Sequence, residues 1–205
     1  MHKEVLTKEQ IELLPLIKSF SKDFFLVGGT AIAFHLGHRH SVDFDLFTDK
    51  KFSNLRIERQ VSKFFEREKT FVSRLEEYTI LVNKVRITFF QYPFKIDSFE
   101  MFKDIIKIPD LLTLATMKAY ALGQRAKWKV YVDIYYIIKD HFSVKKISKR
   151  AEEIFKGEFN EKLFRSQLAY FKDIDYSEEI IYLDGYKVDN KIIERALIDF
   201  SLSKI

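Results

Sequence analysis

The stretch FFLVGGTAIAFHLGHRHSVDFDLF, residues 24–47, decides the fold that we predict for this chain. Its apolar start predicts a short strand that ends at Val27, followed by a Gly-Gly-Thr turn into a helix over residues 30–36. After a short loop, a second predicted strand carries Asp43 and Asp45. The predicted fold and the predicted site both rest on this order of strand, glycine turn, helix and acidic strand.

Asp43 and Asp45 share one face of the predicted strand, because side chains alternate between the faces of a strand, and Val42, Phe44 and Leu46 share the other. Neighbouring carboxylates among apolar residues repel each other and lose hydration, so the pattern favours a bound cation. We expect Mg²⁺, with Mn²⁺ as an alternative, because a hard ion is commonly held by one or two carboxylates plus substrate phosphates. The competing interpretation is a strand end with two solvated carboxylates.

The glycine turn predicts a site for phosphate. Gly28 and Gly29 let an anion approach backbone N–H groups, and the helix N-terminus that follows favours negative charge. Thr30 is either a further phosphate contact or simply the N-cap of the helix. A phosphate cradle beside a metal-binding strand is typical of a nucleoside triphosphate site.

The rest of the first half predicts further strands and helices. Thr7 and Gln10 form a capping-box pattern that opens a helix, and Pro15 within that helix should kink or split it. Ser53 is placed to cap a long helix over residues 54–69. Turn residues then separate runs rich in β-branched and aromatic side chains, which gives about five strands before residue 98.

The second half reads as helical. Asn83-Lys84 is a predicted hairpin turn between the strand residues 80–82 and 85–91. Beyond residue 108, Gly123 is a plausible C-cap for the first helix. The predicted helices cover residues 111–124, 129–139, 146–156, 160–172 and 190–201. Strands followed by helices predict an α+β fold, with a sheet domain over residues 1–105 and a helical domain over residues 106–205.

Two blocks carry a resemblance to a known family. The Gly-Gly-Thr turn followed by Asp-x-Asp resembles the signature of DNA polymerase β-like nucleotidyltransferases, and its fuller text resembles the AbiEii/AbiGii toxin family of bacterial toxin–antitoxin and phage-defence systems. The second block, LLTLATMKAYALGQRAKWKVYVDIYYII over residues 111–138, resembles the same family. The likeness covers roughly residues 20–140 and implies a polymerase β-like mixed sheet flanked by helices, followed by a C-terminal helical bundle that completes the active site.

The resemblance also implies roles for individual residues. Lys118 is expected to be catalytic or to neutralise triphosphate charge, and Arg125 shares its helix face at a spacing of seven. Asp133 is expected to be a catalytic acid, and Arg39 and Ser41 are plausible substrate contacts. The competing interpretations are a Lys118 side chain that only extends outward to solvent, and an Asp133 that pairs with Lys129 on a helix surface.

One departure from the family pattern concerns a third acid. Polymerase β-like sites usually take a third carboxylate from a neighbouring strand, but the expected strand KVRITFFQ, residues 84–91, contains none. Asp97 follows that strand too late, so Asp133 is the better replacement. The four residues His35, His38, Arg39 and His40 match no zinc template, and we expect structural or surface histidines.

Composition sets broad limits on the class of protein. The chain has 205 residues, a net charge of +5 and no cysteine, which excludes disulfides and thiolate metal sites. It lacks both an apolar run long enough to span a membrane and a signal-peptide layout, so we expect a cytoplasmic protein that does not contact membranes. The basic balance is compatible with nucleic acid, triphosphate or an acidic partner.

The leading hypothesis is a Mg²⁺-dependent nucleotidyltransferase that moves NMP from an NTP to an acceptor hydroxyl. The resemblance implies the toxin of a type IV toxin–antitoxin pair, with RNA, such as a tRNA 3′ end, as acceptor and a winged-helix antitoxin as partner. One alternative is transfer to a small molecule or a protein side chain. The other is a degenerate, non-catalytic domain that binds nucleotide or a partner, which the missing strand acid favours.

Overall fold

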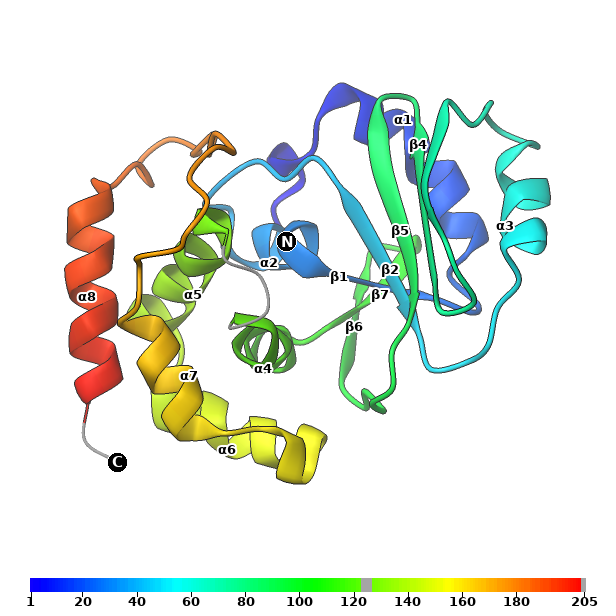
Figure 1. Ribbon diagram of the computed structural model, residues 1–205. Helices are drawn as coiled ribbons and strands as arrows, with labels where there is room; N and C mark the ends of the chain where they lie inside the picture. Colours follow the sequence, from blue (N-terminus) through cyan, green and yellow to red (C-terminus); the bar gives the residue numbers. More distant parts are fainter. Residues whose placement is uncertain (123–126, 204–205) are drawn as a thin grey trace. The chain divides into compact units, whose positions relative to one another are not determined.

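The computed structural model describes residues 1–122 and 127–203. The chain divides into two compact units, Met1–Asp110 and Leu111–Ile205. The first contains the strands, and the described elements of the second are helices, so the protein has the α+β class expected from the sequence (Figure 1). The division falls at Asp110 rather than at residue 105, because residues 106–109 form the second strand of a hairpin.

The first unit is built on a five-stranded mixed sheet with the order β1-β2-β5-β4-β3. Only the central pair, β2 and β5, runs parallel; the other neighbours are antiparallel. The five strands are β1 (Phe25–Val27), β2 (Phe44–Thr48), β3 (Lys69–Ser73), β4 (Glu77–Val82) and β5 (Val85–Gln91). Asn83 and Lys84 both have positive φ values, as the predicted hairpin turn between β4 and β5 requires.

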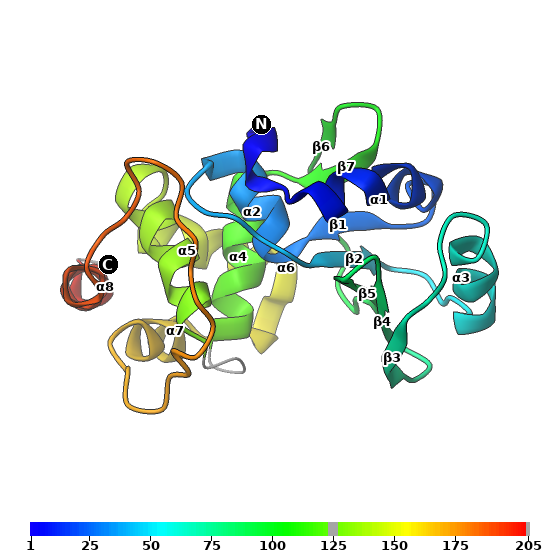
Figure 2. The same ribbon diagram turned by 90° about the horizontal axis from the view of Figure 1, so that it is seen from above.

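Helices α1 (Lys8–Ser19) and α3 (Asn54–Val61) lie on one face of this sheet (Figure 2). That face is apolar: Phe44, Leu46, Ile80, Ile87 and Phe89 are fully buried, as are the helix residues Leu13 and Leu16. Burial of this one continuous layer is the main hydrophobic stabilisation of the unit.

The start of α1 confirms the predicted capping box: the Gln10 N–H donates to the Thr7 hydroxyl and the Thr7 N–H donates to the Gln10 side chain. The predicted split at Pro15 is wrong, because α1 continues through it to Ser19. Pro15 is exposed, and so is Ile11, whose carbonyl loses its partner at the proline; water can therefore replace the missing N–H.

The remaining elements of the first unit are η1 (Lys3–Val5), α2 (Gly28–Leu36) and the hairpin of β6 (Phe99–Phe102) with β7 (Ile106–Pro109). The Phe34 ring of α2 stacks on Phe102 with centroids 4.0 Å apart. The sequence reasoning missed β6 and β7 because both are only four residues long. It also made α3 too long: the helix ends at Val61 and not near residue 69.

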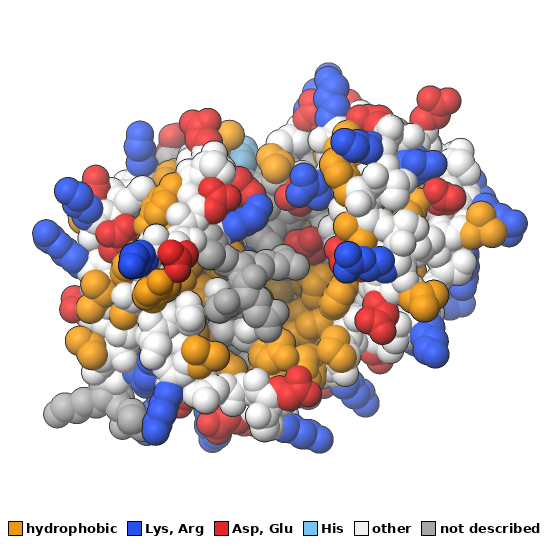
Figure 3. Space-filling model, viewed as in Figure 1, with side chains coloured by type: hydrophobic (Ala, Val, Ile, Leu, Met, Phe, Trp, Pro, Cys, Tyr) orange, Lys and Arg blue, Asp and Glu red, His pale blue; other side chains and the backbone are white. Residues whose placement is uncertain are grey.

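The second unit contains five α-helices among its described residues. They are α4 (Leu111–Ala121), α5 (Trp128–Asp140), α6 (Val144–Phe155), α7 (Glu161–Leu168) and α8 (Asn190–Leu202), with the 3₁₀ turn η3 (Lys156–Glu158) after α6. Helix α4 packs against α5 and α6, and α8 packs against α5 and α7. None of the described helices combines the length and the apolar character needed to cross a membrane. On the face shown in Figure 3, positive and negative side chains are interspersed, so the net charge does not gather there in one patch.

Candidate functional site

The glycine turn and the acidic strand meet at Gly28. Helix α2 already begins at Gly28, with Val27 as its N-cap, so the expectation that Thr30 caps the helix is wrong. Gly28 has φ +74°, a left-handed conformation that favours glycine. A Cβ at this position would lie 2.0 Å from Oδ2 of Asp45, so the carboxylate sits directly against the Gly28 backbone. The missing side chain of Gly28 therefore leaves space for the Asp45 carboxylate.

Gly29 has a similar role toward Arg39 and Ser41. A Cβ at Gly29 would lie 2.6 Å from a terminal guanidinium nitrogen of Arg39 and 3.2 Å from the Ser41 hydroxyl oxygen. Both side chains are buried, and the Arg39 guanidinium also donates a 2.9 Å hydrogen bond to the His40 carbonyl. The loop before β2 is thus folded back onto the first turn of α2.

Thr30 ties the same two segments together. Its buried hydroxyl donates to the carbonyl of Asp43 and lies 2.9 Å from the Ser41 hydroxyl. The side-chain amide of Gln10 on α1 reaches the same Asp43 carbonyl at 3.5 Å. Thr30 and Gln10 therefore fix the backbone at Asp43, one residue before β2 begins.

Asp43 and Asp45 are both partly exposed, whereas Phe44 between them is fully buried. Val42 does not follow the predicted alternation: it is 52% exposed because it precedes the strand. Seven of the predicted site residues thus converge in the first unit: Gly28, Gly29, Thr30, Arg39, Ser41, Asp43 and Asp45. The Asp45 carboxylate lies against the glycine turn, and the backbone of Asp43 is held two residues before it; carboxylates are ligands that suit a hard divalent cation. We call Gly28, Gly29, Asp43 and Asp45 the acid–glycine site.

The strand beside β2 carries no acid. Strand β5 pairs in parallel with β2, so that Thr88 lies opposite Asp45 and Ile87 lies opposite Phe44. Arg86, two residues before Thr88 on β5, lies on the same strand face as Thr88. Within residues 1–122 and 127–203, no group of three or more acids or histidines is arranged to hold a metal ion. A metal ion at this position would be held by Asp43, Asp45 and the bound substrate.

The second unit holds a buried ion pair. Lys118 on α4 and Asp133 on α5 pair at 3.0 Å, with side-chain exposures of 13% and 0%. Asp133 is therefore not the surface partner of Lys129; Lys129 and Lys127 instead both contact Glu178. Burial raises the pKa of Glu178, but the two lysines outweigh that effect and hold it below its ordinary value.

Two further predictions concern the residues 123–125 and the histidines near the start of β2. Arg125 and Gly123 lie outside the described residues. Two of the histidines make separate contacts: a ring nitrogen of His35 on α2 lies 3.2 Å from the Pro109 carbonyl, and one of His40 in the following loop lies 3.1 Å from the Val5 carbonyl. Burial lowers the pKa of His35. These contacts match structural histidines better than metal ligands.

Sequence reasoning missed a cationic and aromatic cluster at the β3 side of the sheet. Phe71 on β3 is 43% exposed, with the Lys69 amino group 5.0 Å and the Arg86 guanidinium 4.9 Å from its ring centroid. The register of β3 shifts between Thr70 and Val72, so Phe71 lies in a β-bulge. The isolated run KTFVS gives no sign of this arrangement, since it depends on the pairing of β3, β4 and β5.

Solved structures with this fold include nucleotidyltransferases. MenT4, a nucleotidyltransferase toxin of Mycobacterium tuberculosis H37Rv, aligns with a TM-score of 0.54 at 8% identity, over 95% of this chain and 82% of its own. JHP933 of Helicobacter pylori aligns with a TM-score of 0.63 at 14% identity, over 96% and 91% of the two chains. Both likenesses show the fold that this chain shares with these proteins.

Sequence comparison gives the family. Residues 16–181 match the family described as nucleotidyl transferase AbiEii toxin, type IV TA system. The chain therefore belongs to the AbiEii family of nucleotidyltransferase toxins. An uncharacterized protein of Aquifex aeolicus (strain VF5) is 31% identical over 186 residues, which cover 87% of this chain and 88% of the relative.

We predict that Gly28→Ala destabilises the protein by about 2 kcal/mol or more, because the new Cβ meets the Asp45 carboxylate and the positive φ is strained. Urea unfolding measures this change. Gly157→Ala is the matched control: nothing lies within 4 Å of its Cβ position, so it should shift stability by less than about 0.5 kcal/mol. Equal effects of the two substitutions would contradict the close approach of Asp45 to Gly28.

Removing one partner of the Lys118–Asp133 pair should destabilise the helical unit strongly. Lys118→Met leaves the Asp133 carboxylate buried without its ion-pair partner, and we expect a loss of about 3 kcal/mol in a thermal or urea melt. Lys118→Met combined with Asp133→Leu should recover much of that loss. The control is Lys139→Gln at the exposed Lys139–Asp140 pair, which should change stability by less than about 0.5 kcal/mol.

Proposed function

We propose that the protein transfers a nucleoside monophosphate from an NTP to a hydroxyl of an RNA acceptor, such as a tRNA 3′ end, in a Mg²⁺-dependent reaction. The observation that carries the proposal is the contact of the Asp45 carboxylate with the Gly28 backbone at the start of α2. It brings an acid, the type of ligand that Mg²⁺ prefers, to a helix N-terminus that favours phosphate. The family membership supports nucleotidyl transfer as the reaction.

In this reaction the acceptor oxygen bonds to the α-phosphorus while the bond between that phosphorus and the β-phosphate's bridging oxygen breaks. Pyrophosphate leaves, and the hydroxyl proton passes to solvent or to a nearby carboxylate. When bound, Mg²⁺ would neutralise phosphate charge and lower the pKa of the attacking hydroxyl. Asp43 and Asp45 would hold it, and Gly28 and Gly29 would present backbone N–H groups to the phosphates.

The buried contacts of other residues suggest supporting roles. Thr30, Arg39 and Ser41 are nearly inaccessible, so we assign them to holding the loop before β2 against α2. Lys118 would neutralise phosphate charge. Asp133 has no exposed surface, and we assign it to fixing the position of the Lys118 amino group.

The cluster at Phe71 supports a nucleic acid as acceptor. An exposed ring between two cations suits a single strand, since bases stack on aromatic rings and phosphates pair with Lys and Arg. Arg86 belongs to the same strand face as Thr88, the register partner of Asp45. An RNA strand bound at Phe71 would thus follow the sheet face that carries Asp45. The type IV family further suggests a protein antitoxin, for which we keep the winged-helix class as the expectation.

The reaction is tested with labelled NTPs, Mg²⁺ and total RNA. We expect label in RNA with the native chain, and a loss of at least about 1,000-fold in rate for Asp45→Asn and Asp43→Asn, because each removes a metal-binding charge. EDTA should abolish transfer and added Mg²⁺ should restore it. Asp49→Asn, which changes an acid in the loop after β2, should retain activity. Transfer to protein or small molecules instead of RNA would contradict the acceptor assignment, and equal transfer by Asp45→Asn would contradict the reaction.

The acceptor surface is tested separately. Arg86→Gln together with Phe71→Leu should raise the KM for RNA about tenfold and leave the KM for NTP unchanged, because both side chains are assigned only to the acceptor. Lys145→Gln with Lys149→Gln, two exposed lysines of α6, removes more charge and should have little effect. If both double variants change the KM for RNA equally, the effect is one of net charge and not of this cluster.

A further inference from the structure

A cavity lies in the first unit, on the sheet face opposite to Asp45. It has a volume of about 410 Å³, within the range of small-molecule sites, and it lies between the end of α1, the loop after β2 and the start of α3. The Phe20 and Phe24 rings at its base pack on Phe89, which belongs to the buried sheet face, at 4.9 and 5.3 Å. The cavity is therefore distinct from the acid–glycine site.

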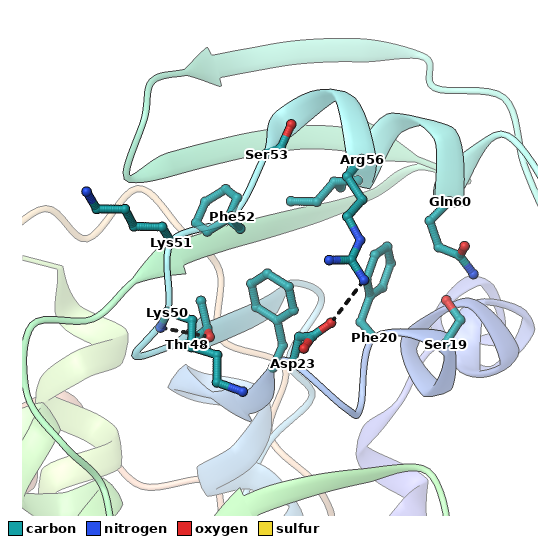
Figure 4. Close-up of a pocket in the computed structure, with 12 residues that line it drawn as sticks. Ser19, Phe20, Asp23, Thr48, Lys50, Lys51, Phe52, Ser53, Arg56 and Gln60 are labelled. Atoms are coloured by element: carbon teal, nitrogen blue, oxygen red, sulfur yellow. Dashed lines mark hydrogen bonds and ion pairs between the residues drawn. The ribbon is translucent and has the colours of Figure 1, made fainter.

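Its lining carries an excess of positive charge. Lys50, Lys51 and Arg56 line the cavity together with a single carboxylate, that of Asp23 (Figure 4). Among the described residues, no salt bridge pairs Lys50 or Lys51. A smaller hollow of about 150 Å³ shares Asp23, Phe24 and Lys50 with it and adds two lysines, Lys22 and Lys107, and one acid, Asp49. An anion is thus the favoured occupant.

The Arg56 side chain is available to such an anion. Figure 4 shows it extending from α3 into the cavity toward Asp23. The two charged groups are 3.6 Å apart, longer than a charge-assisted hydrogen bond, and the Arg56 side chain is 82% exposed. An exposed ion pair of this length contributes little stability, so a phosphate group can replace Asp23 as the partner of the guanidinium.

The lining of the cavity also contains aromatic rings. Phe52 is half-buried and stands beside Phe24, with ring centroids 5.7 Å apart, while Ser53 and Gln60 offer polar groups nearby. Figure 4 shows Phe52 between Lys51 and Arg56, so rings and cations alternate around the cavity and match a ligand that has a flat apolar group and a phosphate. From this arrangement we propose that the cavity binds a small organic phosphate of the mononucleotide type, with its phosphate at Lys50 and Arg56 and its flat group against Phe52.

The test is calorimetric titration of the full chain with AMP at low salt and without Mg²⁺. We expect saturable binding by the native chain, and an affinity at least about tenfold lower for Lys50→Gln with Arg56→Gln, because two charge-assisted contacts are lost. Phe52→Leu should weaken AMP binding about threefold without changing the weaker binding of inorganic phosphate. Both charged side chains are exposed, so the variants should keep the native melting temperature; Arg56→Gln alone, with about a threefold loss, serves if the double variant is unstable.

Two controls separate binding in this cavity from binding elsewhere on the chain. Lys145→Gln with Lys149→Gln removes the same charge from α6 and should leave AMP binding unchanged. Asp45→Asn should also bind AMP normally even where it no longer transfers nucleotides, so this proposal and the proposed function can fail independently. The proposal is overturned if the native chain does not bind AMP at millimolar concentration, or if Lys50→Gln with Arg56→Gln binds it as the native chain does. AMP binding that is lost in Asp45→Asn would assign it to the acid–glycine site instead and would equally overturn the proposal.

Discussion

The first unit depends on the close approach of a carboxylate to a backbone that has no side chain in the way. Asp45 can lie against Gly28 only because that residue lacks a Cβ and adopts a positive φ. The same contact links the end of β1 to β2, which are antiparallel neighbours with Val27 opposite Asp45. The local backbone geometry of this turn thus determines where the Asp45 carboxylate lies.

A second set of contacts holds the backbone at Asp43 in place. The carbonyl of Asp43 accepts hydrogen bonds from Thr30 on α2 and from Gln10 on α1, so two helices hold the residue that enters β2. Arg39 and Ser41, in the loop between α2 and β2, pack onto Gly29. Most predicted binding residues are therefore structural neighbours of the acids, and their buried side chains restrict the conformations that Asp43 and Asp45 can adopt.

The parts of the fold that sequence reasoning predicted are those with strong local signals. The Thr7–Gln10 capping box, the Asn83-Lys84 turn and the convergence of the glycine turn on Asp45 each rest on a few adjacent or regularly spaced residues. The contacts of Phe71 and Arg86 were missed because they depend on strand register, and the cavity at Arg56 was missed because it joins three separate segments. Asp133 was expected as a functional acid, but its partner Lys118 became clear only from the packing of α4 on α5. Whether these residues bind substrate stays a prediction.

The parallel pairing of β2 with β5 has a consequence for biosynthesis. Strand β2 receives its second neighbour only after residues 85–91 have been made, since β5 supplies that edge. Until then Asp45 belongs to an incomplete sheet whose apolar face lacks Ile87 and Phe89. A nascent chain therefore holds the strand that carries Asp45 by one neighbour, β1, until residues 85–91 have left the ribosome.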